Sequence, residues 1–195
     1  MAGSLKALAV SSPSFPIPHL DRALAWAAQK MGVTFAPEQQ EALKTAVQNR
    51  VAIITDGPGT GKSTILKGLL LILAAKGVAI ELAAPTGRAA KRLSEACGRE
   101  ARTIHRLLEY DPSIRGFKRN SEHPLSADLI IVDESSMLDI VLVNPLFQAA
   151  AHGSSLLLVG DVDQLPSVGP GNVLRDCIES GGLPGGASDQ NLPPG

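Results

Sequence analysis

Short apolar runs alternate along this chain with longer segments in which apolar residues recur at helical spacing. The runs consist almost entirely of Ala, Val, Ile and Leu, and they span 51–55, 78–84, 129–132 and 156–160. Aliphatic runs of this length are typical of strands buried on both faces, as the strands of a parallel sheet are.

Segments with helical periodicity separate these runs. We expect helices over 62–75, 86–96, 103–109, 139–151 and 171–179, and two more before the first strand, over 21–31 and 34–48. Asp21 is placed to cap the first of all these helices, and Pro37 stands near the first turn of the second, where proline is tolerated. Residues 111–127 are polar and predict a loop. The alternation predicts an α/β fold in which a parallel sheet carries helices on both faces.

Composition sets the class of protein. Apolar residues make up 44% of the 195 residues and charged residues 19%, as in a soluble globular domain, while aromatics at 3% leave the core to aliphatic side chains. The strongest apolar stretch, Leu69–Ala75, is far too short to span a bilayer. Cys97 and Cys177 show neither metal-ligand spacing nor a disulfide framework, so we expect a reducing, cytoplasmic setting.

The two ends of the chain differ from its middle. Residues 1–19 are rich in proline and serine and predict an irregular leader, and residues 181–195 are dominated by glycine and proline. We therefore divide the chain into a leader and helix over 1–33, a main domain over 34–180, and a disordered tail over 181–195.

Basic residues are concentrated in one central segment. The net charge is only −1, but residues 88–119 hold nine of the 18 lysines and arginines against four acids. This segment is a candidate surface for a polyanion, with an ordinary solvated helix face as the alternative.

The strongest chemical signal is DGPGTGKST, residues 56–64, between a predicted strand and a predicted helix. Glycines let backbone N–H groups turn toward a phosphate, and the helix N-terminus attracts negative charge. Lys62 is expected to reach the β- and γ-phosphates and Ser63 to bind Mg²⁺. Asp56 departs from the usual pattern, which has glycine there, and an acid beside a triphosphate is unfavourable. The nucleotide-binding residues expected in this loop are Gly57, Pro58, Gly59, Thr60, Gly61, Lys62, Ser63 and Thr64.

Two acidic segments follow other predicted strands. LIIVDESS, 129–136, places Asp133 to hold Mg²⁺ and Glu134 to orient and deprotonate the attacking water. LLLVGDVDQLPSVGPG, 156–171, carries Gln164 in a turn from which a polar side chain can reach a γ-phosphate. Taken alone, this second segment is more often an ordinary turn.

Six segments together resemble the ordered motifs of RecD-like DNA helicases, in the 5′-to-3′ branch of superfamily 1. They are FAPEQQEAL (35–43), ITDGPGTGKST (54–64), APTGRAAKRLSE (84–95), TIHRLL (103–108), VDESSMLD (132–139) and VGDVDQLPSVGPG (159–171). The resemblance covers about 34–178 and implies a P-loop NTPase of the RecA-like kind, with ATP and Mg²⁺ as cofactors.

The resemblance also implies roles for individual residues. Gln39 would hydrogen-bond the adenine, and Lys62, Glu134 and Gln164 would form the catalytic set. Single-stranded DNA would be the partner, contacted chiefly through its phosphates and sugars. The implied DNA contacts are Thr86, Gly87, Arg88, Thr103 and His105, where the alternatives are a solvated charge for Arg88 and a capped or core side chain for His105.

Members of this family use a second RecA-like domain, which supplies arginines to the γ-phosphate and which we do not find after residue 180. An arginine finger contributes about 10³–10⁵ in turnover rate. We therefore expect slow hydrolysis by this chain alone, with the second domain on another polypeptide or in a longer protein. A non-catalytic, nucleotide-dependent binding module is the alternative, whereas a small-molecule kinase is disfavoured because no arginine-rich lid is evident.

Overall fold

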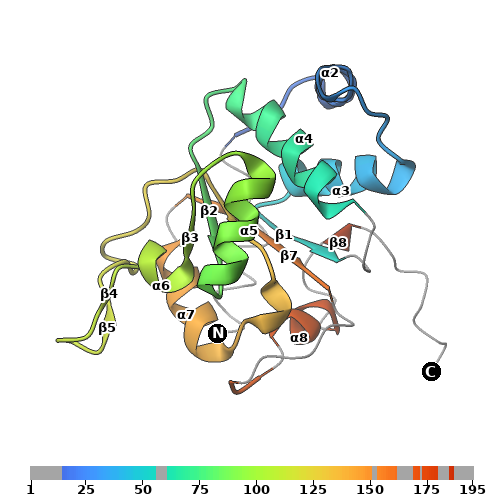
Figure 1. Cartoon of the computed structure of the whole chain (residues 1–195). Coiled ribbons are helices and arrows are strands. Elements are labelled where there is room, and N and C mark those ends of the chain that lie inside the picture. The colour runs from blue at the N-terminus through green and yellow to red at the C-terminus, as the bar shows by residue number, and fades with distance from the viewer. Residues whose placement is uncertain are drawn as a thin grey trace.

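The computed structural model describes residues 15–55, 61–150, 153–161, 169–171, 173–179 and 185–186. Its centre is a parallel sheet of six strands in the order β3-β2-β6-β7-β1-β8, shown in Figure 1. The strands are β1 (Val51–Thr55), β2 (Ile80–Ala84), β3 (Ala101–Thr103), β6 (Leu129–Val132), β7 (Ser155–Gly160) and β8 (Gly185–Gly186). The predicted α/β class is confirmed, with every strand pair of this sheet parallel.

Side chains of each central strand alternate between two hydrophobic clusters, one on each face of the sheet. On β1, Ala52 and Ile54 belong to the first cluster, whereas Val51 and Ile53 belong to the second. A strand that must bury both faces has no place for polar residues, which is why β6, and β1 up to its last residue Thr55, are unbroken aliphatic runs in the sequence.

Helices cover both faces of the sheet (Figure 1). Side chains from α2 (Leu20–Met31), α3 (Pro37–Gln48), α4 (Lys62–Ala74) and α5 (Gly87–Cys97) join the first cluster. Side chains from α6 (Ile104–Leu107), α7 (Ile140–Ala149) and α8 (Val173–Glu179) join the second. These helices lie within a few residues of the predicted ranges.

The N-terminal helix α2 packs onto the main domain. Its side chains Leu24 and Ala27 are buried in the same cluster as Leu69 of α4. Asp21 does not cap the helix as predicted, because the N-cap is His19, at φ 57°, and Asp21 lies within the first turn. Its carboxylate instead forms an ion pair with Lys44 of α3, at 2.9 Å between Nζ and Oδ1.

The predicted loop 111–127 contains most of a small hairpin, which is a correction to the sequence-based expectation. Strands β4 (Tyr110–Asp111) and β5 (Gly116–Phe117) pair antiparallel and extend from α6, away from the main sheet (Figure 1). Strands of two residues leave no alternation to detect in the sequence. The short edge strand β3 was also not predicted, because its three residues, Ala-Arg-Thr, do not form an apolar run.

Two residues of the predicted disordered tail form a short strand. Gly185 and Gly186 form β8 and pair with Ile53 and Ile54 on the outer edge of β1. An unpaired strand edge offers free N–H and C=O groups, which an extended glycine segment can satisfy. The remainder of 181–195 lies outside the described residues. Among the helices that the structure describes, none is long and apolar enough to cross a membrane.

Candidate functional site

Two predicted site residues, and an acid of the segment that carries Gln164, follow three strands whose C-terminal ends share one edge of the sheet. Lys62 comes after β1, Asp133 after β6, and Asp161 after β7, which lies between the other two strands. Because all three strands are parallel, their C-terminal ends point the same way, which is where open α/β sheets bind ligands. The topology thus gathers segments that are far apart in the sequence.

The start of α4 provides the cationic side of this edge. Gly61 adopts φ 91°, and its carbonyl accepts hydrogen bonds from the N–H groups of Thr64 (2.8 Å) and Ile65 (3.0 Å). Lys62 is the first helical residue and is half-buried, while Ser63 is exposed in the same turn. The free N–H groups and dipole of a helix N-terminus favour an anion at this position. Several predicted site residues lie outside the described part of the chain, namely Gly57, Pro58, Gly59, Thr60 and Gln164, as does Asp56.

Gln39 of α3 lies directly against this start of α4. A Cβ atom on Gly61 would meet Nε2 of Gln39, a side-chain end that can turn away, so it is the positive φ that favours glycine at position 61. Oε1 of Gln39 accepts a hydrogen bond from the N–H of Ala36 at 3.0 Å, which satisfies a free donor at the start of α3. The structure therefore places the Gln39 amide beside Gly61, at the start of α4.

Asp133 supplies the acidic side. Its N–H donates to the Ala83 carbonyl at 3.0 Å, which extends the pairing of β6 with β2 by one residue. Burial raises the pKa of the Asp133 carboxyl, and the neighbouring Glu134 carboxylate raises it further. The Glu134 N–H and the Lys62 ammonium act in the opposite direction, stabilising the ionised form. The positive charge of Lys62 therefore acts on the Asp133 carboxyl across this edge of the sheet.

The backbone of Glu134 is held in a left-handed conformation, which costs conformational energy in any residue other than glycine. Its φ is 54° and its ψ 41°, in the left-handed region, and it is the N-cap of the 3-10 helix η1 (Ser135–Met137). The hydroxyl of Ser135 donates to the Val132 carbonyl at 2.8 Å and ties this turn to the end of β6. Strained residues of this kind persist where the surrounding structure fixes them, often at functional sites.

Gly160 is a contact residue that the sequence analysis did not single out. A Cβ atom at this position would lie 2.9 Å from the Ser136 N and 2.8 Å from Leu174 Cδ2. The absent side chain lets the end of β7 approach η1, and it brings Asp161, which is only 3% exposed, next to the acidic turn. The signal available in the sequence was a glycine directly after a buried strand and before an acid.

Four of the five predicted DNA contacts gather at the C-terminal ends of β2 and β3. Thr86 caps α5 by accepting the Ala89 N–H at 3.2 Å, and Thr103 caps α6 by accepting the Arg106 N–H at 3.3 Å. Ala84 and Thr103 are partners in the parallel pairing, so the two helix starts are neighbours. Gly87 and Arg88 lie in the first turn of α5, where Arg88 is exposed.

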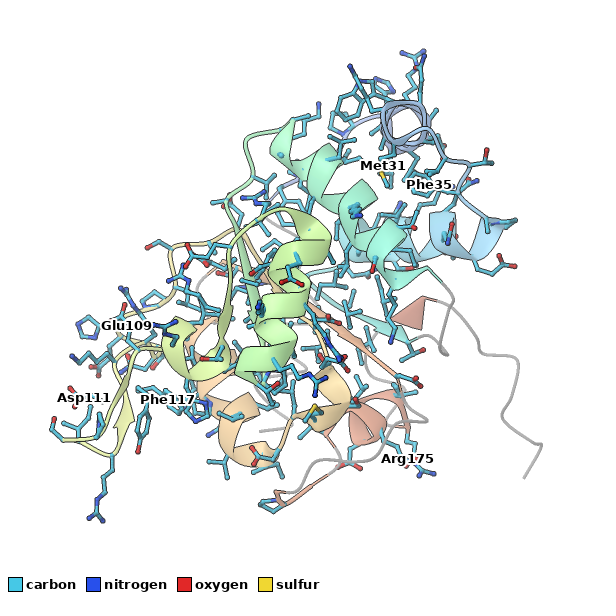
Figure 2. The ribbon with its side chains drawn as sticks, viewed as in Figure 1. Met31, Phe35, Glu109, Asp111, Phe117 and Arg175 are labelled. Atoms are coloured by element: carbon cyan, nitrogen blue, oxygen red, sulfur yellow. The ribbon has the colours of Figure 1, made fainter. Side chains whose placement is uncertain are left out.

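His105, the fifth, takes part in a cluster of rings. Its imidazole lies 5.8 Å from the ring of Tyr110 and 5.7 Å from that of Phe117, measured between centroids, and those two rings are 5.3 Å apart. Tyr110 belongs to β4 and Phe117 to β5, so His105 joins α6 to the hairpin. Figure 2 shows the hairpin with Asp111 and Phe117 labelled and Glu109 at its base.

Comparisons with known proteins agree with this arrangement. A family model described as an AAA domain matches residues 39–170, which is more than half of the chain. The ATP-dependent RecD2 DNA helicase of Deinococcus radiodurans is 46% identical over 134 residues, covering 69% of this chain and 18% of that protein. The RecBCD enzyme subunit RecD of Mycobacterium tuberculosis is 39% identical over 165 residues, covering 73% of this chain and 28% of that protein.

A solved structure supports the fold independently. The crystal structure of the Pif1 helicase from Candida albicans matches with a TM-score of 0.55 and 26% identity, covering 70% of this chain and 34% of that one. This chain spans less than a third of the length of the curated relatives described above. It belongs to the AAA domain family, with the RecA-like fold of a P-loop NTPase, and it resembles the first motor domain of RecD-like superfamily 1 DNA helicases.

Proposed function

We propose that this chain is the ATP-binding and ATP-hydrolysing motor domain of a RecD-like DNA helicase. The observation that supports this proposal best is that Lys62 and Asp133 follow parallel strands at the same edge of the sheet, because a triphosphate with its cation needs both signs of charge at one place. The family of helicases to which the chain is similar implies nucleotide binding. The domain boundaries we propose are 34–180 for the motor, with α2 packed onto it.

We assign the predicted nucleotide-site residues roles in ATP binding or hydrolysis. Lys62 binds the β- and γ-phosphates, and the N–H groups at the start of α4 add their dipole. Glu134 accepts a proton from the attacking water, and the turn into η1 fixes the backbone from which its carboxylate extends. Gln39 is proposed to contact the base; in support, its amide lies beside Gly61, and the hydrogen bond that it accepts from the Ala36 N–H can be released by a turn of the side chain. Gln164 is proposed to follow the γ-phosphate.

The residues present fit a magnesium ion. Mg²⁺ keeps several waters and takes only one or two protein oxygens beside those of the substrate phosphates. Ser63, exposed in the first turn of α4, and Asp133 supply that number. When bound, the ion neutralises the charge that develops on the transferred phosphoryl group.

The test is ATP binding and steady-state ATP hydrolysis, each measured with and without single-stranded DNA. We expect slow basal turnover that DNA stimulates. Lys62→Ala should weaken ATP binding at least tenfold, because the cation opposite the phosphates is removed. Glu134→Gln should retain binding and lose turnover. Unchanged ATP affinity in Lys62→Ala, with folding verified by circular dichroism, would refute the site assignment.

A non-catalytic, nucleotide-dependent DNA- or protein-binding module is the second candidate, favoured by Asp56 at the first glycine position of the phosphate loop. An acid there repels the triphosphate. ATP binding without measurable turnover, unaffected by Glu134→Gln, would support this module. Restored turnover in Asp56→Gly would instead show that the catalytic groups are intact and that Asp56 alone limits them.

A further inference from the structure

A groove on the surface lies between α2 and the last turn of α4, at the end of α4 opposite to Lys62. It encloses about 360 Å³, and its lining includes His19, Arg22 and Trp26 from the α2 side and Ile72 and Lys76 from the α4 side. We call it the α2–α4 groove. Figure 1 shows the two helices packed beside each other. Because α4 has 13 residues, the groove lies roughly 20 Å from Lys62 at the other end of the helix.

Three cationic or titratable side chains surround this groove, and no acid is in its lining. His19, Arg22 and Lys76 are all exposed. Within the described residues, no ion pair or side-chain hydrogen bond engages any of the three. Asp21 is the only acid of α2, and its carboxylate is occupied by Lys44. The groove therefore presents uncompensated positive charge on two elements, which favours an anionic occupant.

Trp26 gives the groove an aromatic wall. It is the only tryptophan of the chain and is 37% exposed, although the core side of α2 is already made by Leu24 and Ala27. The buried side chain of Ile72 forms part of the apolar floor. An indole held by a helix, with cations close by, offers a stacking surface to any nucleobase and charge to the adjoining phosphates.

We infer that the α2–α4 groove binds single-stranded nucleic acid, with one base stacked on Trp26 and neighbouring phosphates at Arg22 and Lys76. An acidic protein segment would use the same cations, but it gives no reason for an exposed indole between them. The contact goes beyond the proposed motor function, because it lies at the far end of α4 and needs neither ATP nor its hydrolysis. It is also separate from the helix starts that carry Thr86 and Thr103.

The position of Trp26 makes the inference directly measurable, since all tryptophan fluorescence of the chain comes from this residue. We expect oligodeoxythymidylate of about eight nucleotides, within the 4–16 that such sites cover, to quench this fluorescence saturably. Arg22→Ala combined with Lys76→Ala should weaken the binding at least tenfold. The same double variant should also lower the salt dependence, by about 0.7 in the slope for each phosphate that is no longer neutralised.

The matched control is Lys30→Ala combined with Lys67→Ala, which removes two exposed cations that lie outside the groove and, like those of the groove, have no ion pair within the described residues. Quenching should be unchanged in this control, and also in Lys62→Ala. Three results would overturn the inference: absence of quenching, quenching that the groove variant does not weaken, or quenching by poly-glutamate at the same charge concentration. The last result would identify an acidic protein segment as the occupant. Loss of DNA-stimulated ATP hydrolysis with the quenching intact would refute only the motor function.

Discussion

Gly160 is the residue at which the end of β7 is fitted to the acidic turn. The atoms that a Cβ would meet include the backbone nitrogens of Ser135 and Ser136, at 3.2 and 2.9 Å, and backbone cannot rotate away as a long side chain can. The same turn fixes Glu134 in its left-handed conformation. The absence of a Cβ atom at Gly160 thus helps to set the backbone position of Glu134, the proposed general base. Small residues carry such information without any chemical group of their own.

Gly160→Ala should destabilise the chain by about 1–3 kcal/mol, the usual cost of overpacking a close contact. Chemical denaturation followed by circular dichroism measures this loss. ATP turnover should fall further than stability alone explains, because Glu134 moves with η1. The matched substitution is Gly116→Ala, where the nearest atom is an ordinary 3.6 Å away, and it should change the free energy of unfolding by less than about 0.5 kcal/mol. Equal stability of the two variants would contradict the packing argument.

The elements of this fold differ in how far the sequence reveals them. The buried strands β1, β6 and β7 and the helices α4, α5 and α7 are long enough for their periodicity to be read, and they were predicted within a few residues. The hairpin β4–β5 was not, because two-residue strands leave no pattern and their partner ring, His105, lies on another element. Residue spacing likewise could not show that β7 separates β1 from β6, since strand order is a tertiary property.

The sequence left two roles open for His105, a DNA contact and a structural side chain, and substitutions of this residue can distinguish them. If its ring fixes the hairpin to α6, His105→Ala should raise amide hydrogen exchange at Lys118 and Arg119, whose N–H groups bond back to Glu109 and Leu108. A ring contact of this kind contributes about 0.5–1.5 kcal/mol, so the exchange rate should rise by roughly two- to thirteenfold.

Two further substitutions distinguish the roles. His105→Phe keeps a ring in the cluster and should restore slow exchange, whereas an imidazole that bonds DNA would still be absent. His123→Ala, at an exposed histidine of the same segment, serves as the control and should leave exchange at the hairpin unchanged. If His105→Ala leaves the hairpin amides protected, the ring cluster does not hold the hairpin.

At the scale of the whole molecule, the basic segment 88–119 has fewer unpaired cations than its composition indicates, because ion pairs engage several of them. Lys91, Arg102, Lys118 and Arg119 are paired with acids, the last three at 3.2 Å or less. Those pairs fasten α5, β3 and the hairpin and partly neutralise the segment. Arg88, in the first turn of α5 beside Thr86, has no such pair within the described residues and lies at the edge of the sheet that carries Lys62. We therefore expect the position of Arg88, more than the number of cations in the segment, to determine where DNA binds.

Arg88→Ala should consequently weaken single-stranded DNA binding about tenfold and lower the salt slope by about 0.7, as expected when one phosphate is no longer neutralised. Fluorescence anisotropy of a labelled oligonucleotide, titrated at several salt concentrations, measures both quantities. Lys118→Ala is the matched control, since its ammonium is already engaged by Asp111 at 3.2 Å and its removal should leave the slope unchanged. If the two variants lose affinity equally, binding follows the summed charge of the segment, and the proposed path along the starts of α5 and α6 must be abandoned.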